Sequence, residues 1–195
     1  MNIDRDNKII MFTSSTTAEG KTTSICNAAV SFAQSGKRVL LIECDLRKAR
    51  IHTVFDIPQV PGLTNILVEK KPFTEVVQHI EEVENLQILT SGVLPPNPAE
   101  TVASASLVHL IDQVKDQFDL ILIDAPPVLA VTDAVILSKL ADGVILIVAS
   151  GESKREEARR AKKALEQVHA RILGVVLTKA EVKSKSYYYY YGETK

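Results

Sequence analysis

The sequence is poor in cysteine and contains no long hydrophobic run. Its two cysteines, Cys26 and Cys44, fall in a predicted helix and a predicted strand, which is too few and too scattered for a disulfide framework or a metal cage. No apolar stretch approaches the roughly 18 residues that a membrane span needs, and Met1 to Lys8 lack the apolar stretch of a signal peptide. We therefore expect a soluble, cytoplasmic protein with reduced thiols.

Neither sign of charge is in excess. The chain has 23 Lys and Arg residues against 24 Asp and Glu residues, for a net charge of -1. Such a balance gives the whole molecule no strong field toward nucleic acid or anionic lipid, and no nucleic-acid partner is expected. With 195 residues, 46% of them hydrophobic, the chain is long enough to bury one substantial core.

Aromatic residues make up only 5% of the chain, yet all five tyrosines are consecutive, from Tyr187 to Tyr191. Hydrophobic periodicity stops at Glu181, so we predict one domain over residues 1–180 and a flexible tail over 181–195. Aromatic side chains with no core to join have no packing role, and Tyr187, Tyr188, Tyr189, Tyr190 and Tyr191 are predicted phosphate acceptors. Chance low complexity, or a sticky peptide that docks a partner, are the alternatives.

Short apolar runs alternate with longer amphipathic runs, which is the βαβ pattern of a parallel sheet covered by helices on both faces. The fold class predicted is α/β, a three-layer α/β/α arrangement with a mostly parallel sheet, as in P-loop NTPases. His52 to Val83 contains three prolines and is read as short helices joined by loops. The predicted strands are Ile9 to Thr13, Arg38 to Glu43, Leu86 to Leu89, Leu120 to Asp124, Gly143 to Val148 and Ile172 to Leu177, and the predicted helices are Lys21 to Ser35, Ala99 to Gln117, Asp133 to Leu140 and Lys154 to His169.

The second of these helices carries a start signal of its own. Asn97 is placed as the N-cap, Pro98 as the first helical residue and Glu100 three residues after the cap, where a capping box has its acidic residue.

A phosphate-binding loop is predicted between the first strand and the first helix. The segment ends in Gly20-Lys21-Thr22, although Ser15 stands where the usual motif has its first glycine. Gly20 allows close approach of the backbone, Lys21 reaches phosphate oxygens, and the Thr22 hydroxyl is a Mg²⁺ ligand. The predicted nucleotide-binding residues are Ser15, Thr16, Thr17, Ala18, Glu19, Gly20, Lys21, Thr22, Thr23 and Arg47.

Two later strands end in carboxylates. Glu43 and Asp45 follow the second strand, and Asp124 ends the strand that begins at Leu120. Because ligands of parallel α/β sheets bind at the carboxyl ends of the strands, these acids should converge on Lys21 and Thr22. Hard oxygen ligands around a triphosphate predict ATP and Mg²⁺ as cofactors. The predicted catalytic residues are Lys21, Glu43, Asp45 and Asp124, and the predicted metal ligands are Thr22, Glu43, Asp45 and Asp124.

These residues resemble the bacterial tyrosine kinases of capsule and exopolysaccharide synthesis over nearly the whole chain. The resemblance implies an ATP-dependent protein-tyrosine kinase that phosphorylates its own terminal tyrosines. It also implies a membrane adaptor with a cytoplasmic activating segment, recruitment to the inner face of the membrane, a cognate phosphatase, sugar-nucleotide enzymes as substrates and a homo-oligomer. The family's motifs fall on Lys21 and Thr22, on Glu43, Asp45, Arg47 and Lys48, on Asp124 to Pro127, on Thr90 to Gly92 and Pro95 to Glu100, and on Tyr187 to Tyr191.

The chain departs from the family pattern at three places. Glu43 replaces the family's first aspartate, and the extra methylene moves the carboxylate by roughly 1 Å, a shift that can cost on the order of a hundredfold in rate. Thr17 and Ala18 replace the usual Pro-Gly of the phosphate loop. The sequence starts directly before the first strand, without the helix that forms the ring in related kinases, which weakens the expectation of an oligomer.

Two other functions fit the same motifs. A partitioning or septum-site ATPase shares the fold and the strand-end acids, but such proteins carry a lysine early in the loop, and Thr13 to Thr17 contain none. A catalytically weak regulatory module, damaged at Glu43, is the second alternative.

Overall fold

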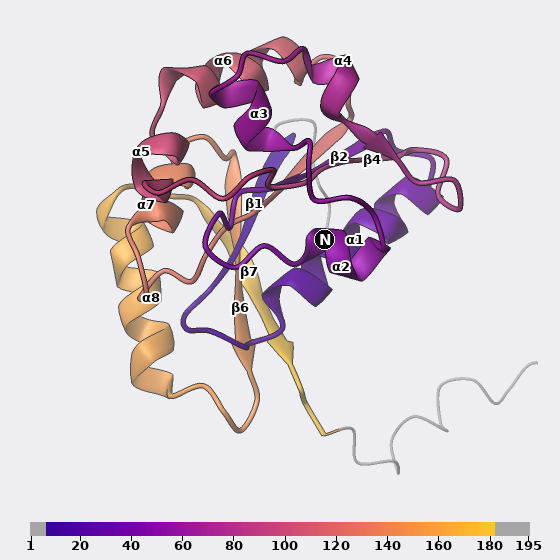
Figure 1. Cartoon of the computed structure of the whole chain (residues 1–195). Helices are drawn as coiled ribbons and strands as arrows, with labels where there is room; N and C mark the ends of the chain where they lie inside the picture. Colours follow the sequence, from indigo (N-terminus) through magenta and orange to yellow (C-terminus); the bar gives the residue numbers. More distant parts are fainter. Residues whose placement is uncertain (1–6, 182–195) are drawn as a thin grey trace, which may run out of the picture.

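The computed structural model describes residues 7–181, which form a seven-stranded sheet in the order β3-β4-β2-β5-β1-β6-β7 (Figure 1). Every strand pair is parallel except β3 with β4. The strands are β1 (Ile9–Ser14), β2 (Val39–Glu43), β3 (Gln78–His79), β4 (Leu86–Leu89), β5 (Leu120–Asp124), β6 (Gly143–Ala149) and β7 (Ile172–Thr178). The helices are α1 (Lys21–Gln34), α2 (Ile51–Phe55), α3 (Leu63–Leu67), α4 (Phe73–Val76), α5 (Pro98–Val102), α6 (Ala105–Val114), α7 (Asp133–Leu137) and α8 (Arg155–Gln167).

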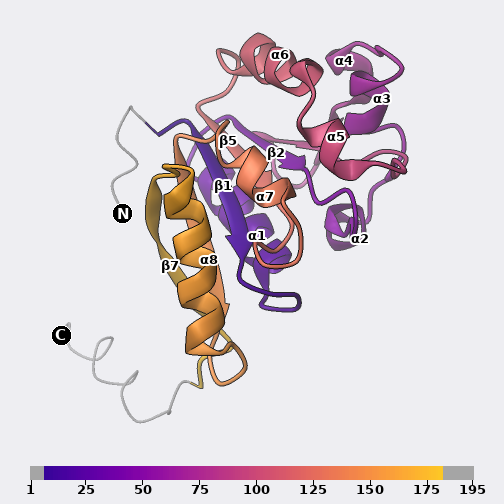
Figure 2. The same ribbon diagram turned by 90° about the vertical axis from the view of Figure 1, so that its left-hand side faces the viewer.

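The aliphatic strands are buried on both faces, which is why helices cover both sides of the sheet. Alternate residues of β1 pack in different halves of the core: Ile10 lies in one hydrophobic cluster with Ile25 of α1, and Met11 lies in the other with Leu110 of α6 and Leu165 of α8. Figure 2 shows α7 and α8 in front of the sheet and α1 behind it. The predicted three-layer α/β/α fold is confirmed.

The prediction of one helix from Ala99 to Gln117 is wrong. Ser104 has extended backbone angles (φ −69°, ψ 145°), so α5 ends before it and α6 begins after it. Serine competes for backbone hydrogen bonds and favours the start of a helix over its interior. Asn97 and Pro98 do begin α5, but the Asn97 side chain donates to Glu100 at 3.3 Å and makes no cap bond to the helix backbone. The capping box is therefore absent.

The segment from His52 to Val83 contains the predicted short helices and one strand that was not predicted. β3 has only two residues, too few for a period of two to show in the sequence. It pairs antiparallel with β4 at the edge of the sheet.

No helix within residues 7–181 combines the length and the apolar composition that crossing a bilayer requires.

Both thiols are buried and are expected to be unreactive in the native protein. Burial, together with the nearby Asp124 and Glu43 carboxylates, raises the pKa of Cys26 to about 12 and also raises the pKa of Cys44. Since the thiolate is the reactive form, a chromogenic disulfide reagent at neutral pH should label neither thiol until denaturant is added, and both thereafter. Rapid labelling in native buffer would contradict this burial.

Candidate active site

A cavity of about 420 Å³ opens at the carboxyl ends of β1, β2 and β5, where the sequence predicts the site. Most of the predicted phosphate loop and Asp45 line it. Within residues 7–181, the predicted site residues that do not line it are Ser15, Thr16, Glu43, Arg47 and Asp124. Four lining residues, Ser14, Lys48, Arg50 and Pro127, were not among the predicted binding residues. The full lining consists of Ser14, Thr17, Ala18, Glu19, Gly20, Lys21, Thr22, Thr23, Asp45, Lys48, Arg50 and Pro127.

The phosphate loop turns sharply before α1. Ala18 and Gly20 both adopt left-handed backbone angles (φ 64° and φ 84°), and Gly20 is the N-cap of the 14-residue helix. The first turn of a helix has N–H groups without intrahelical partners and the positive end of the helix dipole, which together suit an anion. A side chain at Gly20 would be strained at this φ, and its Cβ would lie 3.4 Å from Thr178.

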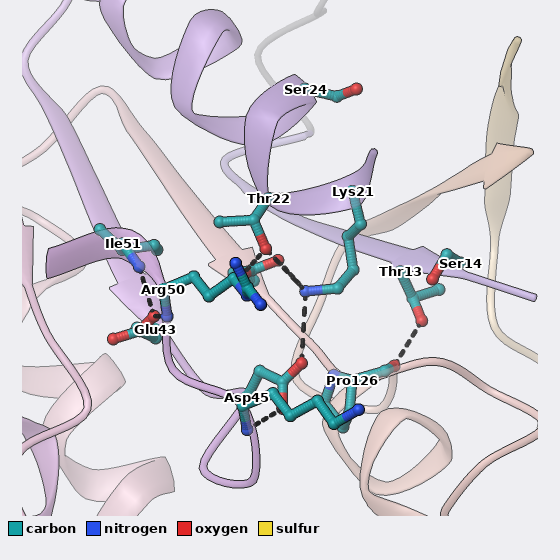
Figure 3. A network of polar contacts seen from close by, with 12 residues as sticks. Thr13, Ser14, Lys21, Thr22, Ser24, Glu43, Asp45, Arg50, Ile51 and Pro126 are labelled. Carbon is teal, nitrogen blue, oxygen red and sulfur yellow. Dashed lines mark hydrogen bonds and ion pairs between the residues drawn. The ribbon is translucent and has the colours of Figure 1, made fainter. Parts of the chain in front are cut away.

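Lys21 joins the loop to two strand-end carboxylates. Its Nζ lies 2.5 Å from Asp124 Oδ1. It also lies 3.5 Å from Asp45 Oδ2, a contact that Figure 3 marks with a dashed line. The Thr22 hydroxyl donates to Asp124 Oδ2 at 3.1 Å. All three charged side chains are buried, and Asp124 is fully so. The structure thus brings together four of the predicted site residues: Lys21, Thr22, Asp45 and Asp124.

Asp124 is the electrostatic centre of this group. Burial raises the pKa of its carboxyl, Lys21 lowers it by ion pairing and hydrogen bonding, and the Asp45 and Glu43 charges raise it further. Lys21 is therefore the cation that makes a buried carboxylate tolerable at this strand end.

The Glu43 carboxylate makes its hydrogen bonds to backbone groups and not to Lys21 or Thr22. Its fully buried carboxylate accepts backbone N–H groups from Arg50 at 2.5 Å and Ile51 at 2.7 Å through Oε1, and from Ser91 at 3.0 Å through Oε2. It does not line the cavity. The carboxylate is committed to holding the start of α2 and the end of β4 against β2.

Arg47 was predicted to bind the nucleotide, and the structure places it outside the lining of the cavity. Its guanidinium forms a bidentate pair with the buried Asp133, with Nε 2.9 Å from Oδ2 and Nη2 3.2 Å from Oδ1. Asp45 shapes the same loop, because its Oδ1 accepts the backbone N–H of Lys48 at 3.1 Å. The loop therefore turns Arg47 away from the cavity and brings Lys48 and Arg50 to it.

Glu19 ties the phosphate loop to the ends of β6 and β7. Its carboxylate accepts the Thr16 N–H at 3.0 Å and the Ser153 hydroxyl, and its carbonyl oxygen accepts the Thr178 hydroxyl at 2.6 Å. The predicted binding residue Thr16 therefore uses its N–H within the loop. In a loop with a single glycine, these side-chain bonds hold the left-handed turn at Ala18.

Ser153→Ala should weaken nucleotide binding about tenfold, since it removes a charge-assisted hydrogen bond that fixes the loop while leaving the cavity lining unchanged. Titration calorimetry with Mg·ADP measures the change. Ser138→Ala is the control, because Ser138 also donates its hydroxyl to a protein acceptor, the Val135 carbonyl at 2.8 Å, but lies away from the loop. Equal affinities of the two variants would show that Glu19 does not position the loop.

The donor set fits a nucleotide with Mg²⁺. Two carboxylates, Asp45 and Asp124, and the Thr22 hydroxyl offer hard oxygen atoms beside the loop, and the buried Ser15 Oγ has no hydrogen-bond partner among residues 7–181. In that part of the chain no group of three or more His, Cys, Asp or Glu side chains is arranged to hold a metal alone. Mg²⁺ commonly takes one or two carboxylates and completes its shell with phosphate and water oxygens.

Comparison with known proteins agrees with this geometry. Residues 7–174 match the AAA domain family. Tyrosine-protein kinase YwqD of Bacillus subtilis is 42% identical over 190 residues, which cover 97% of this chain and 80% of YwqD. Tyrosine-protein kinase CpsD of Streptococcus agalactiae is 35% identical over 94% of this chain and 79% of its own length. The chain belongs to the bacterial tyrosine kinase family.

Solved structures of this kinase family have the same architecture. The kinase domain of VpsO is 37% identical, with a TM-score of 0.88 over 92% of this chain and 88% of that one. The kinase domain of the Escherichia coli tyrosine kinase ETK is 30% identical, with a TM-score of 0.85 over 92% and 72% of the two chains. The septum-site protein MinD of Pyrococcus horikoshii, in complex with Mg-ADP, is 24% identical and shares the fold (TM-score 0.74). The tyrosine kinase function is thus favoured over the partitioning ATPase.

Proposed function

We propose that this kinase transfers the γ-phosphoryl group of ATP to its own tyrosines, Tyr187 to Tyr191, and that this modification regulates capsule or exopolysaccharide synthesis. The observation that carries the proposal is the buried group of Lys21, Asp124 and Asp45 at the start of α1, at the edge where a P-loop enzyme needs it.

The roles follow from the chemistry of each side chain. Lys21 binds phosphate oxygens, and the N–H groups at the start of α1 receive the triphosphate. Asp124, Asp45 and the Thr22 hydroxyl would hold Mg²⁺, which when bound offsets the negative charge of the phosphates. Asp45, which lines the cavity, orients the acceptor hydroxyl by accepting its hydrogen bond. Glu43 acts through the backbone that it holds.

The tyrosines lie outside the residues that the structure describes, and their use as acceptors remains a prediction from the sequence. Its support is the direction of β7, which runs parallel to β6 and ends at Thr178, within hydrogen-bonding distance of Glu19 in the phosphate loop. The interval from Thr178 to Tyr187 spans at most roughly 30 Å when extended, so the acceptors can reach this active site or a neighbour's.

The kinase family also suggests the setting of the reaction. We place the domain in the cytoplasm, recruited to the inner face of the membrane by an adaptor with a cytoplasmic activating segment. A tyrosine phosphatase would reset the tail, sugar-nucleotide enzymes would be further substrates, and a homo-oligomer would allow transfer between chains.

Mapping of phosphate by mass spectrometry after incubation with Mg·ATP tests this proposal. Phosphate should be confined to Tyr187 to Tyr191 and should disappear when all five are replaced by phenylalanine. The five-Phe chain should bind Mg·ADP as tightly as the wild type, which separates loss of the acceptors from loss of the site. Phosphate on other residues only, or none with or without an adaptor segment, would overturn the proposal.

A further inference from the structure

Arg50 is a cation at the cavity that no motif predicted. Its side chain extends toward Lys21 and Thr22 (Figure 3), and it is exposed. Within residues 7–181 its guanidinium makes no ion pair or hydrogen bond, whereas Arg47 is paired with Asp133 and Arg38 with Asp119. Arg50 therefore has all of its side-chain donors available on the side of the site.

The backbone of Arg50 is held by a hydrogen bond to Glu43, whereas its guanidinium has no partner among residues 7–181. The Arg50 N–H donates to Glu43 at 2.5 Å, the next N–H donates to the same oxygen at 2.7 Å, and the accepting carboxylate is fully buried. Arg50 is also the N-cap of α2. An aspartate at position 43 would be shorter by one methylene and could not reach both N–H groups without a backbone shift. The length of the Glu43 side chain, which departs from the family pattern, therefore sets the position of the Arg50 backbone.

The cavity needs a further positive charge. Lys21, the only buried cation of its lining, lies against the Asp124 and Asp45 carboxylates, Glu19 adds a further negative charge to the walls, and Lys48 and Arg50 are the exposed cations of the lining. In phosphoryl transfer, negative charge spreads over the three outer oxygens of the transferred group, and enzymes stabilise it with preorganised cations. A guanidinium suits this task because it stays protonated and presents a planar set of donors.

We propose that Arg50 is a further catalytic residue, whose guanidinium binds the outer oxygens of the phosphoryl group during transfer, and that Glu43 is its positioning residue. The proposal rests on the proposed function. The acceptor oxygen forms its bond to the γ-phosphorus as the bond from that phosphorus to the β,γ-bridging oxygen breaks. The bridging oxygen keeps the electron pair and leaves with ADP, and the phenolic proton goes to water. Arg50 gives up no proton.

The test compares Arg50→Gln and Arg50→Lys with Arg159→Gln, a control on the exposed face of α8. Two quantities are measured: the transfer rate at saturating Mg·ATP and the affinity for Mg·ADP. We expect Arg50→Gln to lower the rate on the order of a hundredfold while the Mg·ADP affinity stays within about threefold, because ADP lacks the group that Arg50 binds. Arg50→Lys should restore part of the rate, since charge remains without the planar donors. Arg159→Gln should change neither quantity.

Glu43→Gln, alone and combined with Arg50→Gln, tests the positioning role. If Glu43 acts through Arg50, its substitution should cost much less rate in the Arg50→Gln background than in the wild type, whereas a purely structural effect would cost the same in both.

Each contrary outcome has a distinct meaning. An unchanged rate in Arg50→Gln, or equal losses of rate and Mg·ADP affinity, overturns the catalytic role. If the wild type hydrolyses ATP without labelling tyrosine, the proposed function fails, and the role of Arg50 is then decided by the hydrolysis rates of the same variants. A wild type that binds Mg·ADP but neither hydrolyses nor transfers overturns both.

Discussion

Lys21→Met is expected to abolish tyrosine phosphorylation and, at the same time, to destabilise the fold by about 3 to 5 kcal/mol. The substitution removes the cation that lies 2.5 Å from the fully buried Asp124 and 3.5 Å from Asp45, and leaves two buried carboxylates without a neutralising charge. Urea unfolding at neutral pH measures the loss. Lys162→Met is the control, because its pair with Glu166 lies on the surface, where such pairs contribute about 1 kcal/mol or less.

The deficit of Lys21→Met should depend on pH. Burial raises the pKa of Asp124 above its ordinary value, and Lys21 opposes that rise, so the pKa is higher still in the variant. A carboxyl whose pKa is higher in the folded state than in the unfolded state binds a proton more readily in the native protein. The free energy of unfolding therefore falls as pH rises toward the folded-state pKa. The difference in unfolding free energy between the wild type and Lys21→Met should therefore shrink as pH is lowered. A difference that is constant with pH would contradict the burial of Asp124 as a charged group.

Glu43→Gln should destabilise the protein by about 3 kcal/mol or more. Glu43 accepts three backbone N–H groups, and hydrogen bonds to charged acceptors contribute about 1.5 to 3 kcal/mol each. Glutamine has an NH₂ group in place of one carboxylate oxygen, and this group cannot accept a hydrogen bond from a backbone N–H. Urea unfolding measures the stability, and hydrogen exchange at the Ile51 and Ser91 amides should show the loss of protection at the same place.

The Glu43→Asp variant tests whether Glu43 holds the backbone of α2 or acts directly in the cavity, as the family pattern implies for position 43. If Glu43 holds α2, the shorter aspartate should lose one or both bonds to Arg50 and Ile51, and both stability and transfer rate should fall. A Glu43→Asp variant that is as stable as the wild type and more active would instead mean that position 43 serves the cavity directly and that glutamate impairs it.

The sequence predicted that Lys21, Thr22 and Asp124 would lie close together, and they do so because local chemistry specifies it. Gly20-Lys21-Thr22 stands between a strand and a helix, and Asp124 ends a buried strand, so the parallel topology alone brings them together. Arg47 and Glu43 depend on contacts that the local sequence does not encode. The partner of Arg47 lies 86 residues away at Asp133, and one partner of Glu43 lies 48 residues away at Ser91.

No pattern in the sequence indicated that Arg50 faces the cavity. It belongs to a loop without periodicity, and whether residue 47 or residue 50 faces the cavity is decided by Asp133 on α7 and by the reach of Glu43. The break between α5 and α6 was missed for a related reason, because the apolar pattern continues across Ser104 while the backbone does not.

Phosphoamino-acid analysis after incubation of the purified chain with labelled Mg·ATP tests the central claim most directly. The claim is that the group of Lys21, Asp45 and Asp124 transfers phosphate to tyrosine. Label should appear as phosphotyrosine in the wild type, with or without an added adaptor segment, and should be absent from Lys21→Met. Label released only as free phosphate by the wild type would contradict the claim and would mean that the same cavity serves an ATPase.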